Sequence, residues 1–157
     1  MSVYDADAIV EQWIYDTLVS YTPLVDIVGN NDDFNVPQVY RGVAPQSEGV
    51  HPPYVIFHNQ TLGGTNIIAL MSGGKIVANE SLYVVKVVGL SSQGDEVSRA
   101  NKAVRDALHG KSYQSVLDGT VLVCVQERTY VFPPEIIEGV VYETRGGLYR
   151  ILSQEEE

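Results

Sequence analysis

The segment SGGK at residues 72–75 is the part of the chain whose residue types best fit a phosphate-binding loop. Such a loop needs glycines for close backbone approach, a lysine, and a Ser or Thr for magnesium, in the order G-x-x-x-x-G-K-[ST]. Here Ala69 occupies the place of the first glycine, and Ile76 follows Lys75 where the hydroxyl belongs. The magnesium ligand is missing. Because Ser-Gly-Gly between apolar stretches is typical of turns, the sequence predicts a glycine turn.

Histidine and cysteine side chains are the next candidates for chemistry. His51 precedes a proline, and His58 and His109 fall at the ends of a predicted strand and a predicted helix. No two of them have metal-ligand spacing, and Cys124 is the chain's single cysteine, so no zinc site is predicted. A nucleophilic pair of Cys124 and His58 would require the fold to join them. Cys124 lies in the apolar run VLVCV, which is typical of a small buried hydrophobe.

Acidic residues form two further sets. Asp32 and Asp33 lie among asparagines, as in a calcium loop, but the alternating ligand positions and the closing bidentate Glu are absent. Glu127, Glu138 and Glu143 could supply paired carboxylates for acid-base catalysis, yet strands commonly carry exposed charges and nothing marks a cleft. We interpret the first set as a turn. The sequence predicts no catalytic residue, no cofactor and no metal.

Lys86 interrupts a run of valines in the middle of a predicted strand. Burying its ammonium group without a partner would cost several kcal/mol. Two interpretations remain open: the stem packs while the charged head reaches solvent, or the head forms an ion pair with a neighbouring subunit.

Composition limits the class of protein. At 157 residues, of which 45% are hydrophobic, the chain fits one domain over 1–157, with flexible ends at 1–6 and 153–157. A net charge of -10 with only 10 Lys and Arg argues against binding of a nucleic-acid backbone. No apolar run reaches the ~20 residues that span a bilayer, and the acidic N-terminus differs from a secretory signal. These features predict a soluble intracellular protein that contacts no membrane.

Periodicity predicts the elements that position these residues. Helical spacing indicates one helix at 7–21 and another from Ser92 to Gly110, and a short helix is expected from Pro23. The second main helix has a capping-box pattern at Ser92, and its core stripe is Val97, Ala100, Val104 and Leu108. The predicted strands cover residues 36–43, 54–61, 81–90, 120–132 and 140–152.

The resulting fold class is α+β. We expect an antiparallel sheet of about four main strands, two helices packed on one face, and an extra β-hairpin arm at residues 62–80. The strand at 81–90 is apolar on both faces, so helices or a neighbouring chain should cover both. A bulge or bend is expected at Arg145-Gly146-Gly147.

Several short sequence motifs follow one another along nearly the whole chain. They are VYRGVAP, PPYVIF, the glycine-punctuated segment, SLYVVKVVG, ALHG, TVLVCVQER and GVVYETRGGLYRI. In this order the chain resembles the tail terminator (tail completion) proteins of long-tailed bacteriophages. LYVVKVVG followed by a helix, and the closing VYETRGGLYRI, carry most of the resemblance, and both are packing patterns rather than chemical signatures.

The resemblance implies a structural virion protein. Such a subunit forms a homo-hexameric ring that caps the end of the tail tube, ends polymerisation and offers a surface to the head connector, without catalytic residues. Its partners would be its own copies, the tail tube protein and the head-tail connector protein, at the neck end of the virion tail after assembly in the bacterial cytoplasm. Alternatives are a head-tail connector or stopper, and a small cytosolic enzyme or ligand-binding domain, which a pocket gathering His58, Cys124 or the Asp32 loop would indicate.

In a ring, the hairpin arm would lean on the adjacent subunit, because an exposed apolar arm marks a binding surface. The alternative is that the arm folds back on its own sheet. DNA would pass through the lumen without specific binding, since an acidic wall repels phosphates. The expected interface residues are Ile67, Ile68, Leu70, Met71, Lys75, Ile76, Val77 and Lys86.

Overall fold

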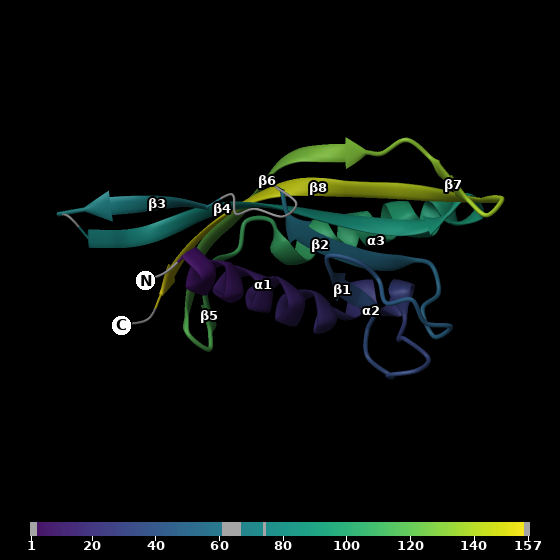
Figure 1. Ribbon diagram of the computed structural model, residues 1–157, viewed down its shortest axis with the longest axis horizontal. Helices are drawn as coiled ribbons and strands as arrows, with labels where there is room; N and C mark the ends of the chain where they lie inside the picture. The colour runs from purple at the N-terminus through teal and green to yellow at the C-terminus, as the bar shows by residue number, and fades with distance from the viewer. Residues whose placement is uncertain (1–2, 61–66, 74, 156–157) are drawn as a thin grey trace.

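The structure is a computed structural model that describes residues 3–60, 67–73 and 75–155 (Figure 1). Its helices are α1 (Val3–Val19), α2 (Thr22–Val28) and α3 (Gly94–Leu108), with a 3-10 turn η1 (Ser91–Gln93) before α3. Its strands are β1 (Val39–Arg41), β2 (Tyr54–Asn59), β3 (Ile67–Ser72), β4 (Lys75–Leu90), β5 (Ser112–Val116), β6 (Gly119–Val131), β7 (Glu135–Ile137) and β8 (Val140–Glu155). α1 and β8 thus include residues 3–6 and 153–155 of the expected flexible ends.

The strands form one curled, mixed sheet in the order β1-β2-β4-β8-β6-β5, with β3 added beside β4 and β7 beside β8. β1 pairs with β2 in parallel, and the other pairs are antiparallel. The predicted α+β class is confirmed. The expected antiparallel sheet of about four main strands is wrong in detail, because the described residues form six strands along the main path and one pair is parallel; besides the two main helices, α2 is the short helix expected from Pro23.

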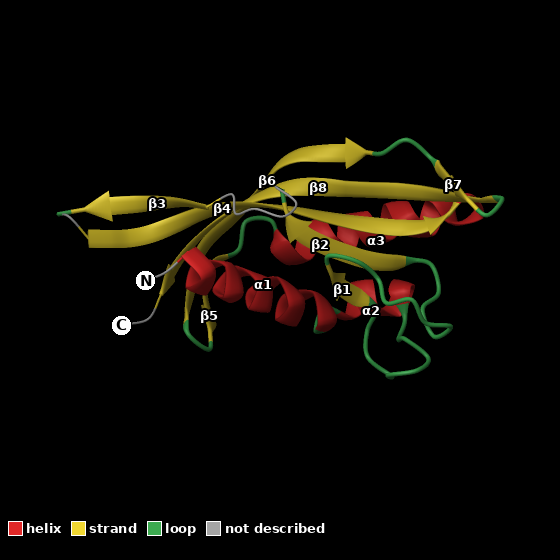
Figure 2. Ribbon diagram, viewed as in Figure 1, coloured by secondary structure: helices red, strands yellow, loops and turns green. Residues whose placement is uncertain are grey.

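The helices lie together on one face of the sheet (Figure 2). β4 turns Tyr83, Val85 and Val87 toward them, all with no exposed area, as its two-residue alternation requires. The α3 stripe of Val97, Ala100, Val104 and Leu108 is buried against this face, as its spacing predicted. No described helix is long and apolar enough to span a membrane.

The opposite face of the sheet has no helix on it (Figure 2). Val84 on this face is 8% exposed, and Leu148, which pairs with it on β8, is 4% exposed. The other residues of the 81–90 strand on this face, Leu82, Lys86, Val88 and Leu90, are half-buried, so helices cover one face of the strand and the other is only partly covered. We call the other the helix-free face.

The start of α3 differs from the expected capping box. Ser92 lies inside the 3-10 turn, and α3 begins at Gly94. The side chain of Gln93 reaches back instead: its Oε1 accepts a hydrogen bond from the backbone N–H of Leu90 at 2.9 Å. The turn shifts the helix start by two residues, so the longer Gln side chain, rather than the Ser hydroxyl, meets the chain before the helix.

The expected bulge at residues 145–147 is also wrong. β8 stays in register with β4 from Ser153 to Tyr142, and the register shifts occur in β6, at 121–123 and 126–128. A Cβ at Gly146 would lie 2.6 Å from the carbonyl oxygen of Val85, and one at Gly147 would lie 2.4 Å from Nε2 of Gln126. These glycines permit close approach of the neighbouring strand and side chain.

β5 and β7 had no counterpart in the sequence prediction. The β5 segment SYQSV is largely polar, and β7 follows directly after two prolines in the segment PPEIIEG, which was interpreted as a link between strands. Both strands are short and gain their order from pairing with β6 and β8. Long-range pairing of this kind leaves little local pattern in the sequence.

Candidate assembly surfaces

The hairpin around the SGGK turn extends beyond the rest of the sheet (Figure 1). β3 pairs with β4 from Ile67–Ser81 to Ser72–Lys75, whereas β8 begins to pair with β4 only at Asn79. Residues 75–78 are therefore paired with β3 alone. We call the ribbon of residues 67–73 and 75–78 the arm; residues 62–66 of the predicted arm and Gly74 lie outside the described residues. A two-stranded ribbon is at most marginally stable in isolation.

The SGGK turn is a hairpin turn. Ser72 pairs with Lys75, and Gly73 has a φ of +59°, in the region where glycine avoids the penalty of a Cβ. Lys75 starts a strand, whereas the lysine of a phosphate loop opens a helix. The structure therefore supports the glycine turn and not the phosphate loop.

The expected interface residues divide between two places. The arm contains seven of them: Ile67, Ile68, Leu70, Met71, Lys75, Ile76 and Val77. Lys86 lies on the same strand but eleven residues beyond Lys75, about 36 Å at the usual rise of a strand. The fold does not bring Lys86 to the arm, and the interface role of all eight residues stays a prediction.

Lys86 lies on the helix-free face under the end of β6. Its Nζ is 5.5 Å from the centroid of the Phe132 ring, a cation–π contact that contributes roughly 0.5–1 kcal/mol at exposed sites. A cavity of about 240 Å³ surrounds this pair, lined by Tyr54, Ile56, Val88, Glu135, Ile137, Tyr142 and Thr144. The stem of Lys86 thus packs among apolar and aromatic groups, which fits the first of its two interpretations.

A second projecting hairpin lies at the end of the molecule opposite the arm (Figure 1). β7 pairs with β8 from Glu135–Tyr142 to Ile137–Val140, and the turn residues Glu138 and Gly139 have φ of +51° and +80°. Several apolar side chains are exposed here: Val131 by 72%, Ile136 by 73%, Ile137 by 53% and Val140 by 42%. We call these four residues the β7 patch. The apolar pair in PPEIIEG was its sequence signal.

The carboxylates considered for acid-base catalysis do not gather. Glu127 contacts Nε of Arg150, whose Nη1 lies 2.7 Å from Oε1 of Glu80, so an ion-paired group spans β4, β8 and β6. Glu138 occupies the β7–β8 turn, and Glu143 pairs in register with Gly89 near the far end of β4. Glu127 is therefore matched with a cation rather than with a second carboxylate.

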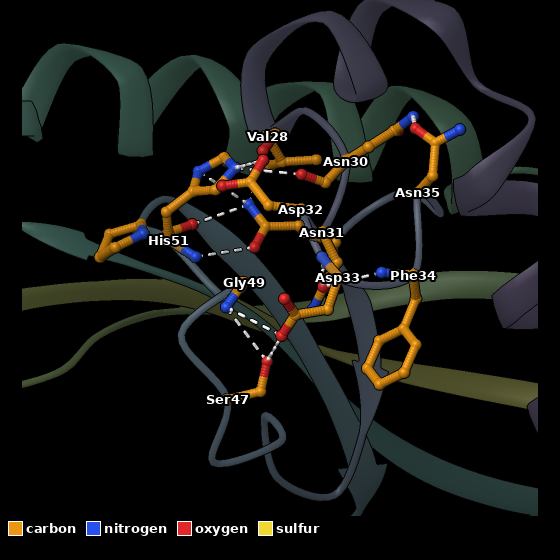
Figure 3. Close-up of polar contacts among 12 residues, drawn as sticks. Val28, Asn30, Asn31, Asp32, Asp33, Phe34, Asn35, Ser47, Gly49 and His51 are labelled. Carbon is orange, nitrogen blue, oxygen red and sulfur yellow. Dashed lines mark hydrogen bonds and ion pairs between the residues drawn. The ribbon is translucent and has the colours of Figure 1, made fainter.

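The Asp32–Asp33 loop is a closed polar network (Figure 3). Oδ2 of Asp33 accepts from the backbone N–H of Gly49 at 3.1 Å and from the hydroxyl of Ser47. Oδ1 of Asn31 accepts from the N–H groups of Asp33 at 2.8 Å and Phe34 at 3.3 Å. These oxygens satisfy the backbone of the loop, as Asx turns do. Across the described residues, no group of three or more His, Cys, Asp and Glu side chains could hold a metal ion.

The side chain of Gln38 connects the same loop to the end of α2. Its buried side chain donates from Nε2 to the carbonyl oxygens of Val28 at 2.8 Å and His51 at 2.7 Å, and its Oε1 accepts from the N–H of His51 at 2.9 Å. His51 is thereby held as part of the loop. The composition that suggested calcium instead reflects a segment that satisfies its own backbone.

Cys124 and His58 are not joined by the fold. Cys124 is fully buried among the core residues on β6, and burial raises the pKa of its thiol to about 12. β4 and β8 lie between β6 and β2, which carries His58, so three strand spacings of about 14 Å in total separate the two strands. A thiol with so high a pKa is a poor nucleophile. The nucleophilic pair is excluded.

Two acidic residues of α1, Asp7 and Glu11, lie close together against the sheet and were not predicted as a site from the sequence. Oε2 of Glu11 lies 2.5 Å from Nε of Arg41, and its Oε1 accepts from the hydroxyl of Tyr83 at 3.1 Å. Burial, and then the nearby carboxylate of Asp7, raise the pKa of Glu11 from 4.5 to about 7. Burial also raises the pKa of Asp7. The i, i+4 spacing of these two residues on a helix was the available signal.

Comparisons with known proteins add one finding. No protein-family model and no curated protein sequence matches the chain. Among solved structures, the chain is similar to a chain of the "Virion of native gene transfer agent (GTA) particle", with a TM-score of 0.71 and 18% identity over 98% of this chain and 99% of the other. The two chains share a fold. The likeness covers nearly the full length of each.

Proposed function

We propose that the protein is a structural virion subunit that forms a ring, caps the end of a phage tail tube, ends tail polymerisation and provides the surface for head attachment. The observation that carries the proposal is the fold shared, over 98% of this chain, with a chain of a gene transfer agent virion. The order of motifs resembling tail terminators points the same way. The fold alone does not specify a role, so the surfaces must support it.

The arm supports ring formation. Its sequence is apolar except at the turn, yet residues 75–78 are paired only with β3. An apolar ribbon that projects from a sheet is stabilised when another surface covers it. In a cyclic ring, every arm meets the same surface on the next subunit.

Charge supports the passage of DNA through such a ring. The chain carries 20 acidic and 10 basic residues. An acidic lumen repels phosphates, whereas a basic lumen would bind them with release of counterions. We expect DNA to cross the ring without specific binding.

The mass of the protein in solution tests the proposal. Light scattering across a concentration range, followed by addition of purified tail tubes, should show a hexamer or a monomer that forms rings on tube ends. Capped tubes should also stop elongating when free tube protein is added. A protein that binds connector rings but ignores tubes would instead be a connector or stopper. A protein that stays monomeric with both tubes and connector rings would refute the proposal.

Deletion of residues 65–78 tests the role of the arm. The deletion removes the ribbon but leaves the part of β4 from Asn79 onward, which pairs with β8. We expect a monomer with a cooperative thermal transition and no rings by mass measurement. Intact rings formed by the deleted protein would rule out the arm as the interface.

A further inference from the structure

We propose that the arm of one subunit docks on the β7 patch of the next subunit, so that the arm turn, which carries Lys75, meets the β7–β8 turn, which carries Glu138. This inference rests on the proposed ring and names the surface that accepts the arm. The occupant of the β7 patch is therefore a second copy of this chain.

Apolar exposure selects the acceptor. Ten large hydrophobic side chains are exposed in the described part of the chain, and five of them belong to β6, the β7 hairpin and the start of β8: Val125, Val131, Ile136, Ile137 and Val140. The last three lie on one paired hairpin, where Ile137 and Val140 share a face and Ile136 lies on the other. Concentrated apolar exposure of this kind on a soluble chain marks a contact surface.

Charge complementarity selects the occupant. Lys75 is the single charged residue of the segment 67–77, which is otherwise apolar on both sides of the turn. The segment 131–141 carries Glu135 and Glu138, both exposed, and no basic residue. A lysine that enters an interface requires a carboxylate partner, because an unmatched charge is costly to bury. The arm therefore supplies the basic group, and the segment 131–141 supplies the acidic groups.

The placement of the two hairpins requires two molecules. The arm and the β7 hairpin project at opposite ends of the long axis (Figure 1), so an arm cannot reach the patch of its own chain. A contact between two different patches is heterologous, and its repetition closes into a ring when the rotation between subunits allows. Of the other exposed hydrophobic side chains, Tyr113 and Leu117 belong to the β5 hairpin, toward the arm's own end (Figure 1), and Phe34, Val36 and Val43 lie in the segments on either side of β1.

Cysteine cross-linking tests proximity. Ser72, which pairs with Lys75 beside the turn, and Ile136, 73% exposed, provide the two positions. The double variant Ser72→Cys with Ile136→Cys should give a ladder of covalent oligomers under mild oxidation of assembled rings. The matched control pairs Ser72→Cys with Ser115→Cys, an exposed position on β5. The native Cys124 is buried and stays in place. The control and the single variants should give no ladder.

Charge reversal tests the ion pair. Lys75→Glu and Glu138→Lys should each weaken ring association about tenfold or more, the range of close interfacial charge pairs. The variant carrying both reversals should recover to within about threefold of the natural protein, because the pair is restored with opposite polarity. Lys111→Glu and Glu48→Lys, both at exposed positions, are the matched controls and should leave association unchanged.

The outcomes separate this inference from the proposed function. If the natural protein forms no ring with or without tubes, the proposed function fails. If it forms rings, but the cross-link is absent and the double reversal gives no recovery, the ring stands and the arm docks elsewhere. Ile136→Asp offers a second probe: a properly folded variant that still assembles with natural affinity would overturn the β7 patch as acceptor.

Discussion

Glu11 is the residue whose replacement tests the energetics of this fold most directly. It lies on α1 between Arg41 of β1 and Tyr83 of β4, with only 12% of its side chain exposed. Glu11→Gln keeps an oxygen that can accept from the Tyr83 hydroxyl but removes the charge. We expect this variant to be more stable than the natural protein at pH 8.

The size of the effect follows from the pKa of Glu11. Its rise from 4.5 to about 7 means that ionisation of this carboxyl disfavours the folded state. At about 1.4 kcal/mol for each pH unit, the difference corresponds to an upper limit of about 3 kcal/mol. Because the Arg41 side chain is 69% exposed, solvent reaches this site and reduces the cost of burying the charge. We therefore expect a measured gain in stability of about 1–2 kcal/mol for Glu11→Gln.

The direction with pH follows from linkage. The folded state binds the Glu11 proton more tightly than the unfolded state, so the contribution is fully present below pH 4.5 and is lost as pH rises through about 7. The raised pKa of Asp7 acts in the same direction. The natural protein should therefore lose stability across this window, and Glu11→Gln should lose less.

Urea unfolding at several pH values between 4 and 8 measures both quantities. Glu48→Gln removes the same charge from an exposed position and serves as control for net charge. The stability gain of Glu11→Gln should grow from near zero at pH 4 to its full value at pH 8. A variant that is instead less stable than the natural protein at pH 8 would refute the reasoning, because the ion pair with Arg41 would then outweigh the cost of burial.

Two further predictions concern the sheet. Tyr149 is fully buried, and its hydroxyl has no hydrogen-bond partner among the described residues. Tyr149→Phe should therefore raise the free energy of unfolding by up to about 1 kcal/mol. Tyr83→Phe removes a hydroxyl that is bonded to a carboxylate and should lower the free energy of unfolding. Gly146→Ala should lower the free energy of unfolding, measured in urea, by about 2–3 kcal/mol, because the new Cβ would lie 2.6 Å from the carbonyl oxygen of Val85. Gly94→Ala, at a helical φ of -54°, should lower it far less. Equal effects of the two substitutions would contradict the close approach of the strands.

The assembly surfaces were only partly predictable. The turn at residues 72–75 follows from local glycine chemistry, and the structure places it between β3 and β4. The β7 patch was missed because Ile136 and Ile137 lie in a short segment after two prolines, where no periodicity develops. Lys86 was expected at the interface because a lysine between valines could form an ion pair with a neighbouring subunit, but its distance along β4 separates it from the arm.

The sequence by itself determined the elements whose side chains repeat with a local period. The alternation in β4 and the stripe from Val97 to Leu108 specify which faces are buried, because burial of apolar groups follows the geometry of each element. Tertiary structure decided what depends on pairing between distant segments. The arm projects because β8 first meets β4 at Asn79, and the pKa of Glu11 rises because the fold buries its carboxyl group close to that of Asp7. Register and enclosure of this kind are set by the whole sheet, and no single segment encodes them.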